Sequence, residues 1–337
     1  MEKVKVAVVG CGFFGEMHTE IYADLPIVQL VGICDTSADI SIKMGQKFNC
    51  KSFTDLNQML DTVKPDILDI CVPDCYHLDA AIAAIERNIN IFIEKPLADT
   101  LDDCRMILKK AEGYKKKVMV GFICRFDARF LTVKQEIDKG RIGDVMYMTS
   151  RRISPVQAGL RYAPLCHITT HSGVHDFDLA RWFAGSEFKK VYAKSVKGKI
   201  IDQGYDVADA VLSICEFENG IIHSHENTWS MPKKFPAYID ATFTIVGTKG
   251  SLHVDMKDSG LQIITDDDME YPDMYYWPEL MGVRQGALRT ELESFVKCVT
   301  DDITPIIGLE DGYRVSQVAL AIMESLDKGV EIDVANI

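Results

Sequence analysis

Val4-Lys5-Val6-Ala7-Val8-Val9-Gly10-Cys11-Gly12-Phe13-Phe14-Gly15 is the stretch that decides the fold of this chain. Its first half is mostly β-branched and indicates a buried parallel strand, which runs into G-x-G-x-x-G and then into a helical pattern. Gly10 permits a tight turn, Gly12 keeps the backbone open to a pyrophosphate, and Gly15 lets the helix lie close to the strand. The N–H groups at the start of that helix favour phosphate. The predicted dinucleotide contacts of this loop are Gly10, Gly12, Phe13, Phe14 and Gly15.

The next apolar run, residues 27–34, ends at Asp35, about twenty positions after the last glycine of the loop. A carboxylate at this place binds the ribose hydroxyls of a dinucleotide. The alternative is an ordinary strand-to-helix turn, but strand, helix, strand and acid in the correct order favour a dinucleotide site. Asp35 also repels a 2′-phosphate, and no Lys or Arg follows it before Lys43. The sequence therefore favours NAD over NADP.

Length and composition indicate a globular protein of about two domains. The chain has 337 residues, 47% of them hydrophobic and 26% charged, with a formal net charge of −13. Nucleic acids and anionic membranes both require a basic surface, and such a charge balance argues against either partner.

The cysteines and the start of the chain suggest a cytoplasmic protein. The first strand begins within about four residues, which leaves no room for a signal peptide. No apolar run approaches the roughly 18 residues of a membrane-spanning helix. The 10 cysteines are scattered without a C-x-x-C pair, as expected for reduced core thiols.

Residues 1–122 alternate between strand and helix patterns. Strands are predicted at residues 4–9, 28–34, 67–72, 89–94 and 118–122, and helices at 14–23, 37–48, 79–88 and 101–114. This alternation is typical of right-handed crossovers and a doubly wound parallel sheet. The first domain is therefore an α/β, NAD-binding Rossmann domain spanning residues 1–122.

From residue 123 onward the hydrophobic period changes. A helix at 128–140 precedes strands at 145–153, 190–197, 208–218, 220–227, 239–246 and 250–255, and helices at 284–299 and 309–328 close the chain. Asn219-Gly220 and Lys249-Gly250 indicate hairpin turns. Residues 123–337 are therefore predicted to form an α+β domain with a largely antiparallel sheet.

Two strand ends in the first domain bear unusual residues. Residues 67–72 run into Pro73-Asp74-Cys75-Tyr76-His77, and residues 89–93 run into Glu94-Lys95-Pro96. Ligands of parallel sheets bind beyond the carboxyl ends of the strands, so both turns face the cofactor. Lys95 precedes a proline, which disfavours helical backbone angles and also permits a cis peptide bond. The alternative for Lys95 is an ordinary surface lysine at a strand end.

One helix in the second half stands out, at residues 169–185. Ser172 is the expected N-cap and Gly185 the expected C-cap of a helix of about three turns. Val174, Phe177, Ala180 and Phe183 form its apolar face, while His175, Asp178 and Trp182 lie on another face.

These motifs together resemble the Gfo/Idh/MocA family of oxidoreductases, named for glucose-fructose oxidoreductase and inositol dehydrogenase. The matching residues are Gly10-x-Gly12-x-x-Gly15 with His18, Asp35, Val72-Pro73-x-x-x-His77, Glu94-Lys95-Pro96, Gly121-Phe122-x-x-Arg125-Phe126, and His175 in a His-x-x-Asp helix. The resemblance spans nearly the whole chain, and Glu-Lys-Pro is its most specific part. It implies a Rossmann domain followed by an antiparallel-sheet domain, so that residues 123–337 serve substrate binding and oligomerisation. It also implies a nicotinamide cofactor, a sugar or polyol substrate, and a homodimer or homotetramer formed through the open sheet.

The resemblance also implies the site residues. The cofactor contacts beyond the glycine loop are Asp35, Pro73, His77, Glu94, Lys95 and Arg125, and the catalytic residues are Lys95, His175 and His171. Family members usually have an Asp four residues before the catalytic His, whereas this chain has His171 there. His171 relays a proton, bonds the substrate, or is a satisfied histidine at the start of the helix.

The chemistry follows from these residue types. Oxidation of an alcohol requires a base for the hydroxyl proton, and a neutral imidazole suits this task near neutral pH. His175 is the predicted base, and Lys95 is predicted to hold the substrate oxygen. His171, His175 and Arg152 are the predicted substrate contacts. Arg151, Arg152 and Arg161 either recognise an acidic sugar or form a solvated positive patch.

A metal site is not expected. His167, His171 and His175 recur every four residues, which on a continuous helix is a spacing for zinc ligands. The cap signal at Ser172-Gly173 interrupts such a helix, so no metal is assigned.

Three functions fit these features. The first is an NAD-dependent dehydrogenase acting on CH–OH groups of a sugar, inositol or related polyol. The second is a glycosidase- or epimerase-like enzyme that keeps NAD bound and oxidises a sugar only transiently. The third is a non-catalytic, dinucleotide-binding regulatory protein. Net reduction of free NAD distinguishes the first two functions.

Overall fold

The structure is a computed structural model that describes residues 3–337, and these residues form two compact units. The first unit comprises residues up to 126 together with Tyr276–Tyr313, and the second comprises Asp127–Tyr275 and Arg314–Ile337. The chain therefore does not divide into two consecutive blocks at residue 122, as the sequence pattern suggests, because a late segment returns to the first unit.

The returning segment is held by the apolar face of helix α9 (Ala287–Thr300). Leu288, Leu292 and Phe295 on this face are completely buried. The ring of Phe295 packs edge-on against Phe92 of strand β5 (Asn90–Glu94), with 5.7 Å between centroids. Burial of these apolar side chains holds α9 against the parallel sheet, whose strands all precede residue 122 in the chain.

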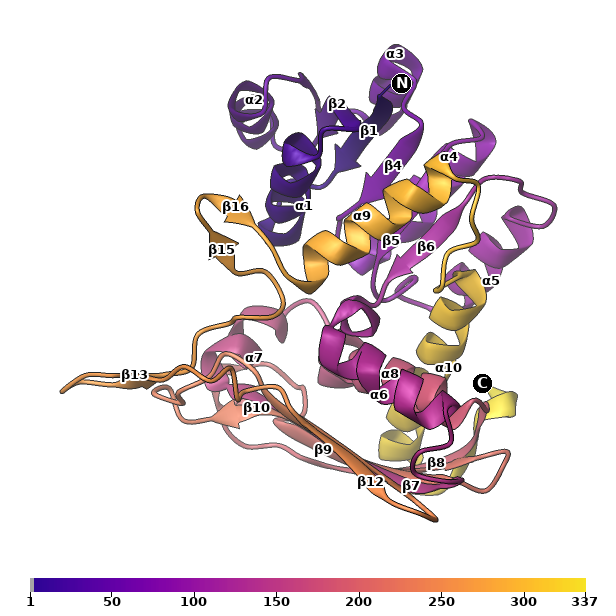
Figure 1. Cartoon of the computed structure of the whole chain (residues 1–337), viewed down its shortest axis with the longest axis vertical. Coiled ribbons are helices and arrows are strands. Elements are labelled where there is room, and N and C mark those ends of the chain that lie inside the picture. The colour runs from indigo at the N-terminus through magenta and orange to yellow at the C-terminus, as the bar shows by residue number, and fades with distance from the viewer. Residues whose placement is uncertain (1–2) are drawn as a thin grey trace. The chain divides into compact units, whose positions relative to one another are not determined.

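The first unit is a doubly wound parallel sheet, as the alternating pattern predicts (Figure 1). Within residues 3–337 its six strands follow the order β3-β2-β1-β4-β5-β6. The strands are β1 (Val4–Val9), β2 (Val28–Cys34), β3 (Lys51–Phe53), β4 (Ile67–Ile70), β5 and β6 (Val118–Gly121). The helices between them are α1 (Phe13–Asp24), α2 (Ala38–Lys47), α3 (Leu56–Val63), α4 (His77–Glu86) and α5 (Leu101–Lys110). The strand order reverses between β1 and β4, and ligands of such sheets bind at this switch point.

The sequence pattern missed β3 and α3. Strand β3 has only 3 residues, with an exposed or half-buried side chain at each position, so it lacks the apolar run that identifies a buried strand. It pairs with the end of β2, next to Asp35. Helix α3 is short and begins at Asp55, whose side chain accepts a hydrogen bond from the Gln58 N–H.

The second unit is a mixed sheet covered by helices. Within the described residues its strand order is β12-β11-β7-β10-β9-β8-β17, and all neighbours pair antiparallel except β7 and β10. The strands are β7 (Val145–Pro155), β8 (Phe188–Val196), β9 (Ala210–Phe217), β10 (Ile222–Met231), β11 (Asp240–Gly247), β12 (Ser251–Asp255) and β17 (Ile332–Asp333). The sheet is thus largely antiparallel, as predicted. Asn219-Gly220 and Lys249-Gly250 lie in the two hairpins where they are expected.

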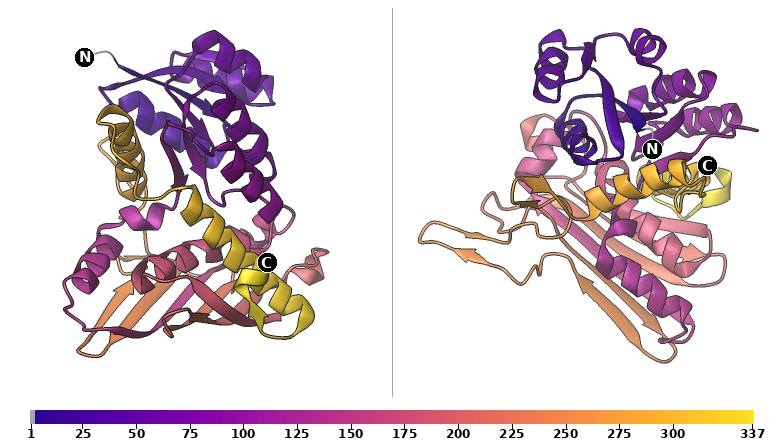
Figure 2. Two further views of the ribbon diagram at one scale, coloured as in Figure 1. Left: turned by 90° about the vertical axis from the view of Figure 1, so that its right-hand side faces the viewer. Right: turned by 45° about the horizontal axis from the view of Figure 1, so that its top comes forward.

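Helices lie against one face of this sheet and leave the other face open (Figure 2). They are α6 (Ala128–Asp138), α7 (Val156–Tyr162), α8 (Val174–Ala184) and the part of α10 (Leu309–Lys328) that begins at Arg314. Along β9 the side chains alternate strictly: Val211, Ser213 and Cys215 are buried, whereas Leu212 and Ile214 are 52% and 56% exposed. The period of two therefore places apolar residues on the open face as well.

Short elements complete the two units. They are β13 (Ile263–Ile264), β14 (Met269–Glu270), β15 (Glu279–Leu280), β16 (Val283–Arg284), and the one-turn segments Asp74–Tyr76, Ile123–Phe126, Ile201–Gln203 and Val334–Asn336. In the part of the chain that the structure describes, no helix is both long and apolar enough to cross a membrane.

Candidate functional site

The glycine loop between β1 and α1 has the geometry that its sequence predicts. A Cβ on Gly15 would lie 1.9 Å from the Gly10 carbonyl oxygen, so only glycine allows α1 to approach the loop this closely. Gly10 has a φ of +90°, and a Cβ there would meet the Cys71 carbonyl oxygen at 2.5 Å. Together these two glycines fix the N-terminus of α1 against the carboxyl ends of β1 and β4.

Gly12 differs from its two neighbours, because a Cβ at this position would have nothing within 4 Å among the described residues. The space in front of Gly12 is therefore open on the side where a side chain would project. Gly12 is also the N-cap of α1, and within residues 3–337 no side chain caps this helix start. An open backbone cradle at the positive end of a helix dipole fits the pyrophosphate of a dinucleotide.

Asp35 connects the end of β2 to this loop. Its Oδ2 accepts a hydrogen bond from the Cys11 N–H at 2.8 Å, and its Oδ1 accepts one from the Ser37 N–H at 2.9 Å. The carboxylate is therefore oriented before any ligand arrives and stays half-buried. Each oxygen has a further lone pair, which suits the hydroxyls of a ribose.

Two aromatic side chains extend from the loop. Phe13 is 48% exposed and Phe14 is half-buried. Trp277, in the segment that returns to this unit, packs edge-on against both rings, with centroid distances of 6.3 and 5.7 Å. Sequence reasoning assigned Trp277 no definite role, because its proximity depends on the return of residues 276–313.

The turns after β4 and β5 are joined by His77. This buried ring lies with Nδ1 2.9 Å from the Pro96 carbonyl oxygen and Nε2 2.9 Å from the Val72 carbonyl oxygen. Burial lowers the pKa of His77, so near neutral pH the ring carries one N–H and donates it to one of these two carbonyl oxygens. The imidazole thus holds the Val72-Pro73 turn to the Lys95-Pro96 turn, whereas the sequence analysis expected it to touch the cofactor.

Lys95 lies at the end of β5, as predicted, and its peptide bond to Pro96 is cis. The residue is half-buried, while its neighbours Glu94 and Pro96 are buried. Glu94 Oε2 accepts a hydrogen bond from the Lys95 backbone N–H at 3.2 Å. The lysine backbone is therefore held by a carboxylate on the same strand.

Arg125 is 3% exposed and contacts the segment that returns to this unit. Its guanidinium donates to Asp311 Oδ1 and to the Ile306 carbonyl oxygen, both at 3.2 Å. Arg125, which the sequence predicts to contact the cofactor, therefore forms a buried ion pair that fixes the chain near α10. Asp127, two residues further along the chain, pairs with Arg129.

Near β4 and α1 three donor side chains come together that the sequence analysis did not group. The ligand atoms of His18, Asp69 and Cys71 lie within 4.8 Å of one another. Within residues 3–337, no other group of three or more His, Cys, Asp or Glu side chains could hold a metal ion in this way. The signal in the sequence is Asp69, a charged residue inside the apolar run Ile67-Leu68-Asp69-Ile70.

In the second unit, the helix predicted to begin at Ser172 begins earlier. A π-helical turn at Thr169–Gly173 continues directly into α8, and Ser172 donates its hydroxyl to Asn227 Oδ1 at 3.0 Å instead of capping the helix. The N-cap prediction is wrong because Ser172 lies inside a continuous helical run and not at its start. Gly185 ends α8 in the left-handed conformation, with a φ of 57°, as expected.

His171 and His175 are both half-buried on this continuous helical run. The ring of His171 lies over Tyr162 of α7, with 3.9 Å between centroids and a tilt of 30°. His175 begins the first turn of α8. Because the π-helical turn is wider than an α-turn, the imidazoles at 167, 171 and 175 do not form a group of close metal donors within the described residues.

A hydrogen-bonded row of side chains supports the π-helical turn from the sheet. Asn227 Nδ2 donates to His225 Nε2 at 3.2 Å, and Ser150 Oγ lies 2.7 Å from His225 Nδ1 and 2.8 Å from His223 Nε2. Burial lowers the pKa of His225 to about 4 and holds that of His223 well below its ordinary value, so both rings are neutral. The row ends at Ser172 and fixes the backbone next to His171.

Arg152 is placed differently from the prediction. This predicted substrate contact is 3% exposed, and its Nε donates to Asp176 Oδ2 inside the unit. Arg151 pairs with Asp240 on the neighbouring strand β11. The first turn of α8 is therefore anchored to β7 by a buried ion pair, and the expected group of three arginines does not form a shared positive patch.

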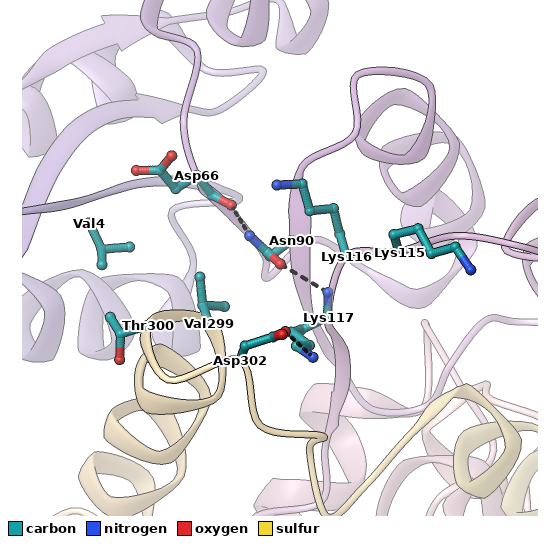
Figure 3. Close-up of a pocket in the computed structure, with 9 residues that line it drawn as sticks. All are labelled: Val4, Asp66, Asn90, Lys115, Lys116, Lys117, Val299, Thr300 and Asp302. Carbon is teal, nitrogen blue, oxygen red and sulfur yellow. Dashed lines mark hydrogen bonds and ion pairs between the residues drawn. The ribbon is translucent and has the colours of Figure 1, made fainter.

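Each unit has a pocket that is lined by residues other than the predicted site residues. A pocket of about 270 Å³ lies at the amino ends of the parallel strands, lined by Val4, Asp66, Asn90, Lys115, Lys116, Lys117, Val299, Thr300 and Asp302 (Figure 3). Asn90 binds the Asp66 carbonyl oxygen and the Lys117 N–H, and Lys117 also pairs with Asp302 (Figure 3). A second hollow of about 510 Å³ follows α6 and β12 in the other unit. The first lies at the edge opposite to the glycine loop and is unsuited to a dinucleotide.

A parallel sheet in this strand order, with an open glycine loop, an oriented Asp35 and a lysine at a neighbouring strand end, defines a dinucleotide-binding oxidoreductase. Residues 4–122 match the oxidoreductase family with an NAD-binding Rossmann fold, and residues 130–253 match the C-terminal domain of the same family. The chain belongs to the Gfo/Idh/MocA family of oxidoreductases.

Several relatives that match over nearly the full length of the chain are named inositol dehydrogenases. The myo-inositol 2-dehydrogenase of Thermotoga maritima is 26% identical, over 96% of this chain and 97% of the relative. The NAD(+)-dependent scyllo-inositol 2-dehydrogenase of Bacillus subtilis is 27% identical, over 98% and 97%. The crystal structure of scyllo-inositol dehydrogenase from Lactobacillus casei with bound NAD(H) and scyllo-inositol has a TM-score of 0.86 at 20% identity, covering 99% of this chain and 100% of that one. The fold is therefore that of these enzymes.

Two glycines of the loop, Gly12 and Gly15, provide a matched test of the site. We expect Gly15→Ala to destabilise the protein by at least about 3 kcal/mol, because the new methyl group would overlap the Gly10 carbonyl oxygen. Gly12→Ala should change stability by less than about 0.5 kcal/mol, since its methyl group enters open space, yet weaken NAD binding at least about tenfold. Urea denaturation and NADH fluorescence titration measure the two effects. Equal NAD affinity of Gly12→Ala and wild type would contradict the assignment of the cradle.

Proposed function

We propose that this protein is an NAD-dependent dehydrogenase that oxidises a CH–OH group of inositol or a related polyol or sugar. The observation that supports it most directly is Lys95 at the carboxyl end of β5, on the same edge of the parallel sheet as the open loop at Gly12. Full-length relatives named myo-inositol and scyllo-inositol dehydrogenases support the choice of substrate class.

The residues of each unit contribute separate parts of this chemistry. When bound, NAD supplies the acceptor for the hydride of the alcohol carbon. Gly10 to Gly15 and Asp35 hold the dinucleotide through backbone N–H groups and a preoriented carboxylate. Lys95 donates a hydrogen bond to the substrate oxygen and stabilises its developing negative charge.

His175 is the proposed general base. A neutral imidazole accepts the hydroxyl proton as the alcohol becomes a carbonyl, and its half-buried position allows that proton to pass to solvent afterwards. The ion pair between Arg152 and Asp176 and the bond between Ser172 and Asn227 fix the backbone on both sides of this residue. Rigid support of this kind preserves the alignment on which proton transfer depends.

We assign His171 to hydrogen bonding with the substrate. Its ring stacks on Tyr162, which fixes its plane, and it lies four residues before His175, where family members usually have Asp. An imidazole held in this way offers one donor and one acceptor to a polyol, which has both kinds of group at each hydroxyl. Arg152, in contrast, acts from behind the helix by holding Asp176.

The substitutions His175→Ala and Lys95→Ala test the catalytic assignment. Each should lower kcat by about 10²- to 10⁴-fold with inositols as substrate, because each removes a group that acts on the transferred proton or on the developing charge. Steady-state production of NADH over a panel of inositols and sugars gives the measurement. NADH fluorescence titration should show binding within about twofold of wild type for His175→Ala.

A histidine far from this chemistry supplies the control. His253 on β12 is exposed and bonds only Thr244 among the contacts described, so His253→Ala should keep wild-type kcat. Turnover in His175→Ala equal to that of wild type would contradict the assignment. Oxidation of the substrate without net formation of free NADH would instead indicate an enzyme that retains NAD and oxidises its sugar only transiently.

Asp35 should determine the choice between the two nicotinamide dinucleotides. Wild type is expected to use NAD at least about tenfold more efficiently than NADP, because the 2′-phosphate would meet a carboxylate that Cys11 and Ser37 hold in place. Asp35→Asn keeps the shape of the side chain and should reduce this preference. The ratio of kcat/KM for NAD and NADP is the measurement, and an unchanged ratio in the variant would contradict the proposal.

The open face of the second unit supports self-association, and the proposal is that it binds a second copy of this chain. Its exposed apolar side chains are Tyr147, Tyr192, Val196, Leu212, Ile214 and Ile222. They lie side by side on paired strands, since Ile214 is in register with Tyr192 on one neighbouring strand and Ile222 is in register with Tyr147 on another. Buried thiols such as Cys11, Cys34 and Cys215 are compatible with the reducing cytoplasm as the location of such an oligomer.

A charge-introducing substitution tests this face. Leu212→Lys combined with Ile214→Lys should raise the dissociation constant of a dimer or tetramer at least about tenfold, since two lysines would be desolvated in the interface. Sedimentation velocity over a range of concentrations measures the shift. Ile42→Lys, at a similarly exposed position on α2, is the matched control. A monomeric wild type, or an unchanged double variant, would contradict the proposal.

A further inference from the structure

A charged residue lies in the centre of the apolar strand β4. Asp69 has no exposed surface, and its strand neighbours Ile67, Leu68 and Ile70 are equally buried. Removal of a carboxylate from water is costly unless charge and hydrogen bonds compensate for it. The position of Asp69 therefore requires partners inside the first unit.

These partners come from α1 and from the end of β4. His18 Nδ1 lies 2.9 Å from Asp69 Oδ2, and the Cys71 thiol donates to Asp69 Oδ1 at 3.1 Å. His18 is itself fully buried, one turn after Gly15 on α1. The close packing of α1 at Gly15 thus brings the imidazole directly onto the strand.

The other nitrogen of His18 faces a second carboxylate. His18 Nε2 lies 3.3 Å from Glu94 Oε1, which is within ion-pair distance although the alignment is poor for a hydrogen bond. Ionised carboxylates only accept hydrogen bonds, so a ring placed between two of them is satisfied when both nitrogens bear a proton. His18 is therefore an imidazolium that links Asp69 to Glu94.

The electrostatic environment agrees with this geometry. Burial favours loss of the His18 proton, but the charge and the hydrogen bond of Asp69 favour its retention, and the pKa of His18 stays well above its ordinary value. Burial also raises the pKa of the Cys71 thiol and keeps it neutral, so Asp69 provides the compensating charge. Tyr22 of α1 also faces this carboxylate, and burial followed by Asp69 raises the pKa of the phenol.

Glu94 transmits this link to the strand end. One of its oxygens faces His18, and the other accepts the Lys95 backbone N–H at 3.2 Å. A Cβ on Gly121 of the paired strand would lie 3.0 Å from Glu94 Oε1, so the glycine leaves the carboxylate the space that it occupies. The ring of Phe92 packs edge-on against His18, 5.6 Å between centroids, and closes the cluster.

We propose that His18 and Asp69 are positioning residues for Lys95. Their ion pair fixes the Glu94 carboxylate, and Glu94 in turn fixes the backbone from which the lysine side chain extends. The proposal rests on the proposed function only in giving Lys95 a catalytic role. The link itself consists of direct contacts along the path from β4 through α1 to β5.

The same donor atoms suggest a metal ion as the other explanation. His18, Asp69 and Cys71 offer three ligand atoms within 4.8 Å of one another. However, each atom already bonds another member of the cluster at 2.9 to 3.4 Å, and the thiol is held in its protonated form, whereas metal binding requires a thiolate. A proton network accounts for the cluster without an ion.

The variant Asp69→Asn tests the role of the network in positioning Lys95. It keeps the volume of the side chain but removes the charge, so kcat should fall at least about tenfold, while KM for NAD stays within about twofold. In a Lys95→Ala background the same substitution should lower kcat by less than about twofold, because its effect passes through the lysine. Equal losses in both backgrounds would overturn the proposal, and so would a wild-type kcat in Asp69→Asn.

Matched variants guard against a general loss of folding. Asp66→Asn changes the same residue type just before β4, at the opposite edge of the sheet, and should keep wild-type kcat and unfolding midpoint. Glu94→Gln is the second variant of the network and should reproduce the fall in kcat with NAD affinity retained. If Asp69→Asn does not fold, the result for Glu94→Gln decides: unchanged turnover overturns the proposal.

A further measurement requires no substrate and so separates this proposal from the proposed function. In wild-type protein with ¹⁵N-labelled histidine, long-range ¹H–¹⁵N correlation at neutral pH should show one ring with both nitrogens protonated, and His18→Gln should remove that signal. A neutral His18 overturns the proposal even if the enzyme oxidises inositols. An imidazolium signal supports the network even if no polyol is oxidised. Stoichiometric metal in the purified protein would also overturn it.

Discussion

The close approach of α1 to the turn after β1 is the constraint on which the rest of the first unit depends. At Gly15 the distance left for a Cβ is 1.9 Å, so the helix axis is fixed by backbone contact rather than by side-chain packing. Two consequences follow from this single contact. The helix start faces the open space at Gly12, and His18, one turn later, reaches Asp69 and Glu94 inside the sheet.

The two units solve the problem of buried polar groups differently. In the first unit, charges compensate each other, since an imidazolium lies between two carboxylates. In the second unit, burial keeps His223 and His225 neutral, and the rings pass hydrogen bonds along a row of hydroxyl and amide groups to Ser172. Both arrangements end next to a residue with a proposed role in chemistry. A rigid polar interior holds such residues more accurately than apolar packing alone, because hydrogen bonds are directional.

Much of the fold could be predicted from local signals. Strands β1 and β2 have the predicted bounds, and the doubly wound sheet and both hairpins are confirmed. Strand β3 and helix α3 were missed because they are too short to show a hydrophobic period. The return of α9 to the first unit was missed because the match between Phe295 and Phe92 is a contact between residues about two hundred positions apart, of which no local pattern gives a sign.

For the site, the sequence by itself determined the glycine loop, Asp35 and the position of Lys95 at a strand end, since these depend on backbone geometry that a few neighbouring residues specify. Only the tertiary structure decided what several of the other polar residues do. Arg152, Arg125 and His77 proved to be buried and bonded to the protein itself, and Asp69 gained a partner from α1. The physical reason is that a buried polar side chain must satisfy its charge and hydrogen bonds, and its available partners are known only once distant segments have packed together.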